Sequence, residues 1–187
     1  MFLFKERVAF YFLINWIISH FMPIQYNIVE IIRGTTVDGP GFRTSIYFAG
    51  CNHKCPGCHN PQTWDSSAGT TMTIEEIMEI VREEDFNVTL SGGDPLFFPA
   101  KTGILIDALK NDGRNVWVYT GYTWEEISAN ESLLNAIRKS DVLIDGRYDK
   151  SLQNTDLLFR GSSNQRLIDV KKSLESNIII KWERPEV

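Results

Sequence analysis

The 187-residue sequence has only three cysteines, and all of them lie within one stretch of eight residues. A secreted protein held together by disulfides usually has an even number of cysteines spread along the chain, so the sequence argues against such a framework. The chain also lacks an excess of basic residues, and its formal net charge of -5 gives no broad positive field for a phosphate backbone. We therefore predict a reduced, cytoplasmic metal protein without a nucleic-acid partner.

A long uninterrupted apolar run is missing as well. Residues 1–21 are rich in Phe, Ile, Leu, Tyr and Trp, but Asn15 and Ser19 interrupt them. The segment is too short and too interrupted for a membrane span, and it lacks the small-residue cleavage site of a signal peptide. We predict no membrane association, a non-domain extension over residues 1–21 with translation starting at Met22, and one domain over residues 22–187.

The sequence has neither an internal repeat nor a low-complexity linker. Beyond residue 27, short apolar runs alternate with amphipathic stretches, which indicates β/α units on a largely parallel sheet. The predicted strands cover residues 28–32, 44–49, 88–90, 115–119, 142–144 and 178–180. An eight-unit barrel takes about 250 residues. The predicted fold is therefore α/β, an open partial β/α barrel of the TIM type.

Two capping boxes mark predicted helix starts. Thr73 with Glu76, and Thr123 with Glu126, have the spacing in which the two side chains bond each other's backbone N–H groups. Apolar residues at helical spacing follow both boxes, and the first helix is expected to end near Glu84. A further helix is predicted from Ile104, Leu105, Ala108 and Leu109.

The three cysteines form the motif Cys51-Asn-His-Lys-Cys55-Pro-Gly-Cys58, directly after the predicted strand 44–49. This spacing lets three thiolates from one loop converge on one inorganic cluster. Three thiolates on a four-iron cluster leave one iron without a protein ligand, and an open metal position is typical of a reactive site. We predict that Cys51, Cys55 and Cys58 bind a [4Fe-4S] cluster.

A zinc site is the alternative interpretation of the same loop. His53 or His59 would then supply the fourth ligand, because sites with three cysteines and one histidine are common. Structural zinc sites usually take their ligands as two separated pairs, and the sequence has no second pair. The cluster is therefore favoured, although the spacing alone does not exclude zinc.

Several stretches beyond residue 27 together resemble a known family. They are Val37–Arg43, Cys51–Trp64, Ser91–Leu96, Val116–Tyr122, Val142–Tyr148 and Arg160–Gln165. On these residues the sequence resembles the radical S-adenosylmethionine superfamily and, within it, the activating proteins of anaerobic ribonucleoside-triphosphate reductase. Two departures are Gly57, where many superfamily members have an aromatic residue, and Asp94, where the usual residue is Glu.

The resemblance implies cofactor-binding roles for Gly57, Cys58, His59, Gly92, Gly93, Asp94 and Thr120. Gly57 and His59 would lie beside the adenosine of S-adenosylmethionine, and the segment Ser91–Pro95 would bind its methionine amino group. Thr120, in a segment that ends a predicted strand, would line the cofactor pocket or belong to a packed turn. Taken without the family, the Gly-Gly-Asp-Pro sequence is a turn, and His59 is a surface residue.

Two other polar segments end predicted strands or lie in loops. Asp145–Tyr148 offers a carboxylate and a guanidinium, and Arg160–Gln165 offers a polar loop. Either could contact a partner protein or the carboxylate of the cofactor, and either could be a solvated loop without a role in chemistry. The sequence leaves these possibilities open.

The resemblance also implies an activity. One electron, from a flavodoxin or ferredoxin, would cleave S-adenosylmethionine reductively to a 5′-deoxyadenosyl radical, which would generate a glycyl radical on the large subunit of the anaerobic ribonucleoside-triphosphate reductase. The protein would then be an oxidoreductase that activates a glycyl radical enzyme. The alternatives are a radical enzyme acting on a small molecule, as in deazapurine synthesis, and a zinc-binding module without catalysis.

Overall fold

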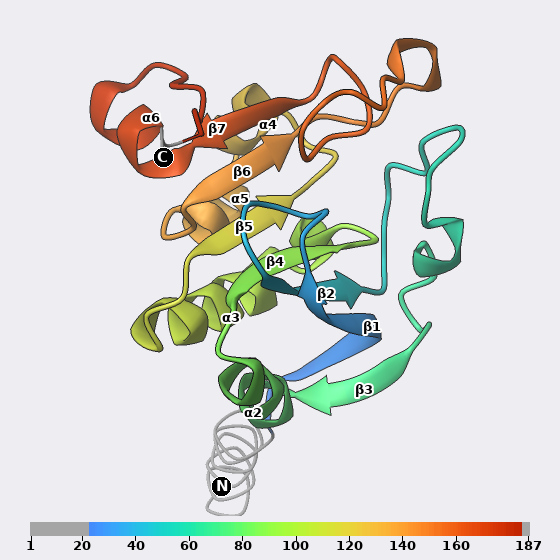
Figure 1. The fold of residues 1–187 in the computed structure, drawn as a ribbon, viewed down its shortest axis with the longest axis vertical. Helices are drawn as coiled ribbons and strands as arrows, with labels where there is room; N and C mark the ends of the chain where they lie inside the picture. The colour runs from blue at the N-terminus through green and yellow to red at the C-terminus, as the bar shows by residue number, and fades with distance from the viewer. Residues whose placement is uncertain (1–22, 185–187) are drawn as a thin grey trace, which may run out of the picture.

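The computed structural model describes residues 23–184, so the predicted extension over residues 1–21 lies outside the described residues. Seven strands form one sheet in the order β3-β1-β2-β4-β5-β6-β7 (Figure 1). The strands are β1 (Gln25–Thr35), β2 (Arg43–Phe48), β3 (Thr70–Thr73), β4 (Asn87–Gly92), β5 (Val116–Tyr119), β6 (Val142–Asp145) and β7 (Arg166–Asp169).

Five α-helices belong to the described part of the chain. They are α2 (Ile74–Glu84), α3 (Pro99–Asn111), α4 (Trp124–Ser128), α5 (Glu131–Ile137) and α6 (Val170–Ser176). Single 3-10 turns lie at Pro61–Thr63, Pro95–Phe97 and Lys150–Leu152. No helix among residues 23–184 has the length and apolar character needed to cross a membrane.

The parallel part of the sheet is its centre. Strands β2, β4, β5 and β6 are parallel neighbours, with α2 before β4, α3 between β4 and β5, and α4 with α5 between β5 and β6. The flanking pairs β1–β2, β1–β3 and β6–β7 are antiparallel, and within the described residues no α-helix lies between β1 and β2 or between β6 and β7. The two edge strands, β3 and β7, lie at opposite ends of the strand order, so the predicted open partial barrel is confirmed.

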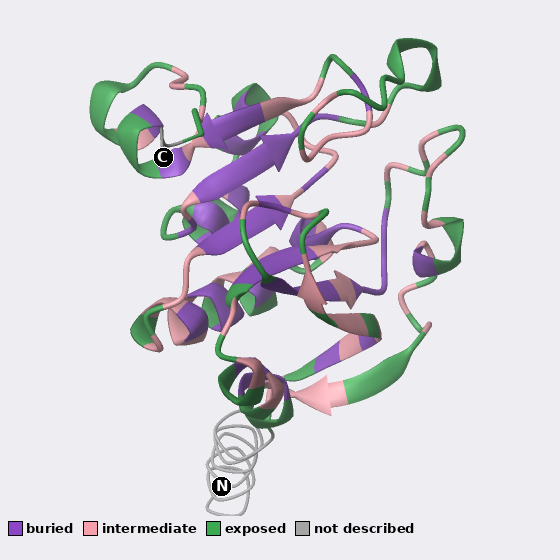
Figure 2. Cartoon of the chain, in the orientation of Figure 1, coloured by how far each residue is buried: buried purple, intermediate pink, exposed green. Residues whose placement is uncertain are grey.

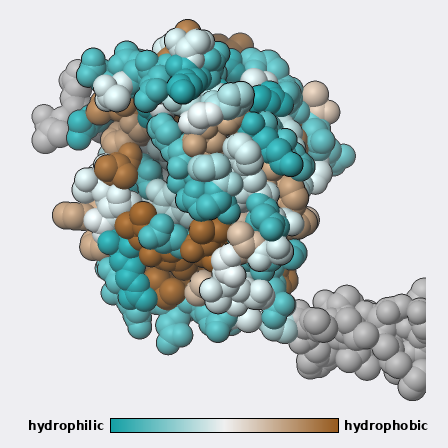
Figure 3. Space-filling view, turned by 90° about the vertical axis from the view of Figure 1, so that its right-hand side faces the viewer, coloured by the Kyte–Doolittle hydropathy of each residue, from teal (hydrophilic) through white to brown (hydrophobic). Residues whose placement is uncertain are grey.

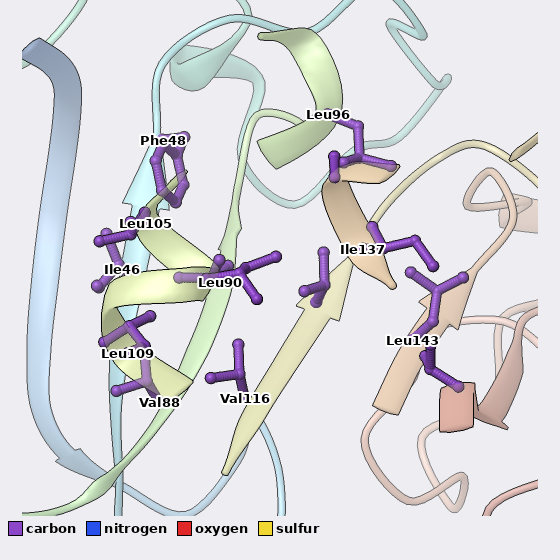
Figure 4. Packing of buried hydrophobic residues seen from close by; sticks show 14 of the residues in the cluster. Ile46, Phe48, Val88, Leu90, Leu96, Leu105, Leu109, Val116, Ile137 and Leu143 are labelled. Atoms are coloured by element: carbon purple, nitrogen blue, oxygen red, sulfur yellow. The ribbon is translucent and has the colours of Figure 1, made fainter. Parts of the chain in front are cut away.

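The main core lies between the sheet and its helices. Alternate residues of the strands point to this side, among them Leu90, Val116 and Leu143, and they pack against Leu109 and Ile137 of the helices (Figure 4). All five are fully buried. Figure 2 shows the same pattern, with buried central strands and exposed loops beyond them. A continuous apolar core thus fixes the positions of the strand ends.

The opposite face of the sheet carries an aromatic cluster. Trp117 alternates with the core residues of β5 and packs edge-on against Trp182 and Phe159, with ring centroids 4.8 and 5.4 Å apart. Phe159 belongs to the long loop between β6 and β7, so this cluster fastens that loop over the sheet.

The predicted helix starts agree well with the structure, and the last predicted strand does not. Both capping boxes are present with reciprocal hydrogen bonds. The strand predicted at residues 178–180 is wrong: the last strand is β7, followed by α6, and only Lys181 makes an isolated bridge to Ile168. Within the apolar run at 178–180, Ile179 packs against the core, while Ile178 is exposed.

Candidate functional site

The loops that follow the parallel strands meet at one end of the sheet. They enclose a cavity of about 490 Å³. The predicted site residues that line it are Cys51, Cys55, Cys58, His59, Gly92, Gly93 and Thr120. Carboxyl ends of parallel strands are where β/α proteins gather their sites. Figure 3 looks at the side on which these loops lie and shows apolar surface grouped within a largely hydrophilic face.

The cysteine loop is closed at its base by backbone hydrogen bonds. The amide of Gly50 donates to the carbonyl of Thr63 at 2.8 Å, and the amide of Cys51 donates to the carbonyl of Trp64 at 3.2 Å. Within the loop, Cys58 N–H donates to the carbonyl of Cys55 at 3.0 Å. The segment is therefore a defined loop whose thiols share one cavity.

The three thiols differ in exposure. Cys51 is buried, while Cys55 and Cys58 are partly exposed. Burial raises the pKa of both Cys51 and Cys55, and backbone N–H groups of His53 and Lys54 oppose this rise in the pKa of Cys51. Among residues 23–184, no three Cys, His, Asp or Glu side chains stand at metal-ligand positions, so the thiols share the cavity without a preassembled geometry.

Gly92 and Gly93 are required by the close approach of two backbones. A Cβ on Gly92 would lie 2.3 Å from the amide nitrogen of Phe48, and one on Gly93 would lie 2.3 Å from the carbonyl oxygen of Gly50. The amide of Gly93 also donates to the carbonyl of Phe48 at 2.8 Å. The glycine pair thus joins the end of β4 to the root of the cysteine loop, besides presenting backbone to the cavity.

Asp94 has its partners within the protein. Its side chain is 2% exposed and does not line the cavity that holds the thiols. The carboxylate accepts hydrogen bonds from His53, Leu96, Thr120 and Gly121. The segment Ser91–Gly93 therefore faces the cavity, while Asp94 holds the loops around it.

The other two residues of the predicted adenosine site have different surroundings. Gly57 is exposed, has a φ of +77°, and lies under the aliphatic stem of Lys150. His59 lines the cavity, with its ring centroid 5.0 Å from that of Tyr148. Tyr148 comes from the loop after β6, so His59 lies where two loops approach each other.

Two side-chain donors at the cavity have no partner among the described residues, and the loop of only one of them, Arg160, was predicted from the sequence as a possible contact. Nε1 of Trp64 and Nε of Arg160 are buried without a hydrogen-bond partner, although both residues line the cavity. Arg160 is also the only Lys or Arg among the described residues that line it, and its Nη1 donates to the carbonyl of Gln165 at 3.1 Å. Buried donors usually have partners, so this cavity offers unused hydrogen-bonding capacity.

The charged side chains of the Asp145–Tyr148 segment bond to other residues of the protein. The carboxylate of Asp145 accepts from the amide of Trp124 at 2.7 Å and from Arg166. Arg147 pairs with Glu126 at 3.0 Å. Neither charged side chain lines the cavity, so of the two segments left open by the sequence, only the Arg160 loop brings a charge to it.

Comparisons with known proteins agree with this arrangement. The family model described as 4Fe-4S single cluster domain matches residues 37–168. The anaerobic ribonucleoside-triphosphate reductase-activating protein of Enterobacteria phage T4 is 38% identical over 139 residues, which cover 70% of this chain and 86% of that protein. The protein of the same name from Escherichia coli K12 is 35% identical over 153 residues, covering 75% and 94%.

Among solved structures, QueE from Escherichia coli matches 65% of this chain and 71% of its own, at 15% identity and a TM-score of 0.43. A match at this level does not by itself establish a shared fold. The family model and the curated relatives carry the assignment, and the cluster predicted from the cysteine motif is the one for which the matched family is described. The chain belongs to the 4Fe-4S single cluster domain family and, within it, to the anaerobic ribonucleoside-triphosphate reductase-activating proteins.

Proposed function

We propose that this protein is an iron-sulfur activase that generates the glycyl radical on an anaerobic ribonucleoside-triphosphate reductase. The observation that carries the proposal is the meeting of three thiols from one loop with the Gly92-Gly93 backbone in one cavity. Relatives at 35–38% identity are named for activating this reductase. The functional domain would comprise residues 22–187.

Cys51, Cys55 and Cys58 would be the three protein ligands of the cluster. The donor set fits, because thiolates are the usual ligands of iron-sulfur clusters and the loop offers no fourth cysteine. Burial raises the pKa of Cys51, and the N–H groups of Lys54 and His53 near its sulfur oppose this rise. This loop would leave one iron free for S-adenosylmethionine.

The remaining cavity would bind S-adenosylmethionine. The backbone of Gly92 and Gly93 would face the methionine end, with Asp94 and Thr120 fixing that loop, while Gly57 and His59 would lie at the adenosine end. Arg160 would pair with the carboxylate, because its guanidinium is the only Lys or Arg cation at the cavity among the described residues. A hydrogen bond between two ionised groups is about twice as strong as one between neutral groups.

The cluster that Cys51, Cys55 and Cys58 would hold would supply one electron for breaking the sulfur to 5′-carbon bond of S-adenosylmethionine, which would give methionine and a 5′-deoxyadenosyl radical. That radical would take a hydrogen atom from a glycine of the reductase large subunit, giving 5′-deoxyadenosine and the glycyl radical. A flavodoxin or ferredoxin would supply the electron. The chain's own residues would bind and orient the substrate and keep water from the radical.

The test is anaerobic reconstitution of the full chain with iron and sulfide, followed by reduction with S-adenosylmethionine and the reductase present. We expect 5′-deoxyadenosine and a glycyl radical signal from the reductase. Deoxyadenosine without a protein radical would indicate a small-molecule substrate instead. A colourless protein that binds zinc and gives neither product would contradict the proposal.

A further inference from the structure

A histidine inside the cysteine motif makes a buried contact with the glycine loop. Nε2 of His53 lies 2.7 Å from Oδ2 of Asp94, and the two side chains are only 6% and 2% exposed. With hydrogen on Nε2, His53 donates to this oxygen, which also accepts from the amide of Gly121. The contact spans 41 positions of the sequence and links the loop after β2 to the loop after β4.

The same carboxylate joins a third loop. Asp94 accepts from the hydroxyl of Thr120 at 2.9 Å and from the amide of Gly121 at 3.0 Å, both in the loop after β5. The amide of Leu96, in its own loop, donates at 2.8 Å. One buried carboxylate therefore holds together the cysteine loop, the glycine loop and the loop of Thr120. Among the described residues, His53 is the side chain of the cysteine loop that bonds this carboxylate.

The position of the His53 ring is fixed from its other sides too. Tyr122 packs against it edge-on, with ring centroids 4.6 Å apart. A Cβ on Gly121 would lie 2.3 Å from Cδ2 of His53, so glycine is needed for the ring to fit. Cys51 and Cys55 lie two residues before and after this fixed ring.

We infer that His53 is a positioning residue, which holds the segment between Cys51 and Cys55 where these cysteines line the same cavity as Gly92 and Gly93. The inference rests on the proposed function, because it concerns the loop that would bind the cluster. Residues that hold metal ligands in place change metal affinity by about 10- to 100-fold when they are replaced. His53 also lines the cavity, and the role inferred for it is to act through the loop, with Nε2 held by Asp94.

The chain offers a matched control at the other end of the strands. There the carboxylate of Asp141 accepts from Nζ of Lys110 at 2.7 Å and from the amide of Val116 at 2.6 Å. This contact also joins separate elements through one carboxylate, and it lies far from the cysteine loop, beside the start of β6. Lys110→Met should therefore disturb the fold without moving the cysteine loop.

The experiment compares the wild type, His53→Ala, His53→Gln and Lys110→Met after anaerobic reconstitution of the full chain. The first measurement is the rate at which a chelator removes iron, the second is the change in the electron paramagnetic resonance spectrum of the reduced cluster when S-adenosylmethionine is added, and the third is the thermal midpoint. For His53→Ala we expect iron loss about 10-fold faster than in the wild type, and a smaller spectral change. Glutamine places an amide donor near the position of Nε2. His53→Gln should therefore lose iron at nearly the wild-type rate and show most of the wild-type spectral change.

Lys110→Met should lower the thermal midpoint while its iron loss and spectral change stay as in the wild type. Iron loss from His53→Ala at the wild-type rate, with the same spectral change, would overturn the inference and leave the proposed function intact. A larger spectral change in His53→Ala would assign the histidine to iron, and would also overturn it. A wild-type chain that takes up no cluster would overturn the inference and the proposed function together.

Discussion

The two ends of the parallel strands both hold buried polar side chains, and they use them differently. At the amino end, Arg43 is 1% exposed and donates to Thr89, to the carbonyl of Val88, and to the side chain and carbonyl of Asn115. At the carboxyl end, the Asp94 contacts border a cavity, and two donors at that cavity remain without partners.

The buried polar contacts at the amino end serve stability, and the cavity at the carboxyl end serves ligand binding. Burial lowers the pKa of Arg43 to about 10, which still leaves it charged at neutral pH, and its hydrogen bonds all end on protein atoms. At the carboxyl end the unpartnered donors of Trp64 and Arg160 belong to residues that line a cavity, whereas the unpartnered hydroxyls of Thr44 and Ser45, next to Arg43, do not. We therefore expect substitutions at the amino end to change stability, and substitutions at the carboxyl end to change cofactor binding.

The largest expected effect is the loss of a cluster ligand. Replacing Cys55 by Ala should reduce glycyl radical formation below detection, because two thiolates would remain for the cluster. The folded chain should persist, since Cys55 is partly exposed and lies outside the core. Iron content, visible absorption and the radical yield measure the effect. Full radical yield from this variant would show that the cysteine is not a ligand.

The next effect is on stability, at the opposite end. Arg43→Met should lower the free energy of unfolding by about 3 kcal/mol, because it leaves several buried acceptors without a donor. Urea unfolding of the cluster-free chain measures this, with Arg82→Met as the control, since Arg82 is exposed and pairs only with Asp112. Iron uptake per folded chain should equal that of the wild type. An unfolding change no larger than that of the control would contradict the prediction.

Arg160→Gln tests the unused capacity of the cavity. We expect the dissociation constant for S-adenosylmethionine to rise about 10-fold, since a hydrogen bond to a charged group is worth about 1.5–3 kcal/mol. Arg147→Gln is the matched control, because Arg147 pairs with Glu126 and does not line the cavity. Anaerobic titration calorimetry measures both. Equal affinities in the two variants would exclude Arg160 from the binding site.

The sequence predicted what depends on local patterns. The capping box of Thr73 and the cysteine spacing each depend on residues a few positions apart. In the structure the capping box begins α2, and the three cysteines lie in one loop that lines one cavity. The break between α4 and α5 was missed, where Asn130 caps a second helix start. β3 was missed as well, because its four residues gain strand structure by pairing with β1.

The contacts of Asp94 could not be predicted, for a related reason. Its partners come from three loops, and the pairing of His53 with Asp94 spans 41 positions of the sequence. The glycine pair was predicted to follow a strand, whereas β4 includes Gly92, and the contact of the pair with the backbone of Phe48 and Gly50 depends on the parallel pairing of β2 with β4. Sequence patterns therefore identify the loops, and only the sheet shows how they fit together.

The smallest expected effect concerns a charge at the carboxyl end that serves the fold. Hydrogen bonds from Arg166 lower the pKa of Glu125 from 4.5 to about 2. A carboxyl group with a lowered pKa stabilises the fold above its usual pKa, and this contribution is lost as the pH falls from 4.5 towards 2. Because Glu125 is 61% exposed, the contribution at neutral pH should be no more than about 1 kcal/mol. Glu125→Gln should therefore lower the thermal midpoint slightly at pH 7, and the difference from the wild type should shrink below pH 4.5. S-adenosylmethionine affinity should stay unchanged, because Glu125 does not line the cavity. A weaker affinity would mean that this ion pair also shapes the site, and that the separation between the two ends of the strands is less sharp than the contacts indicate.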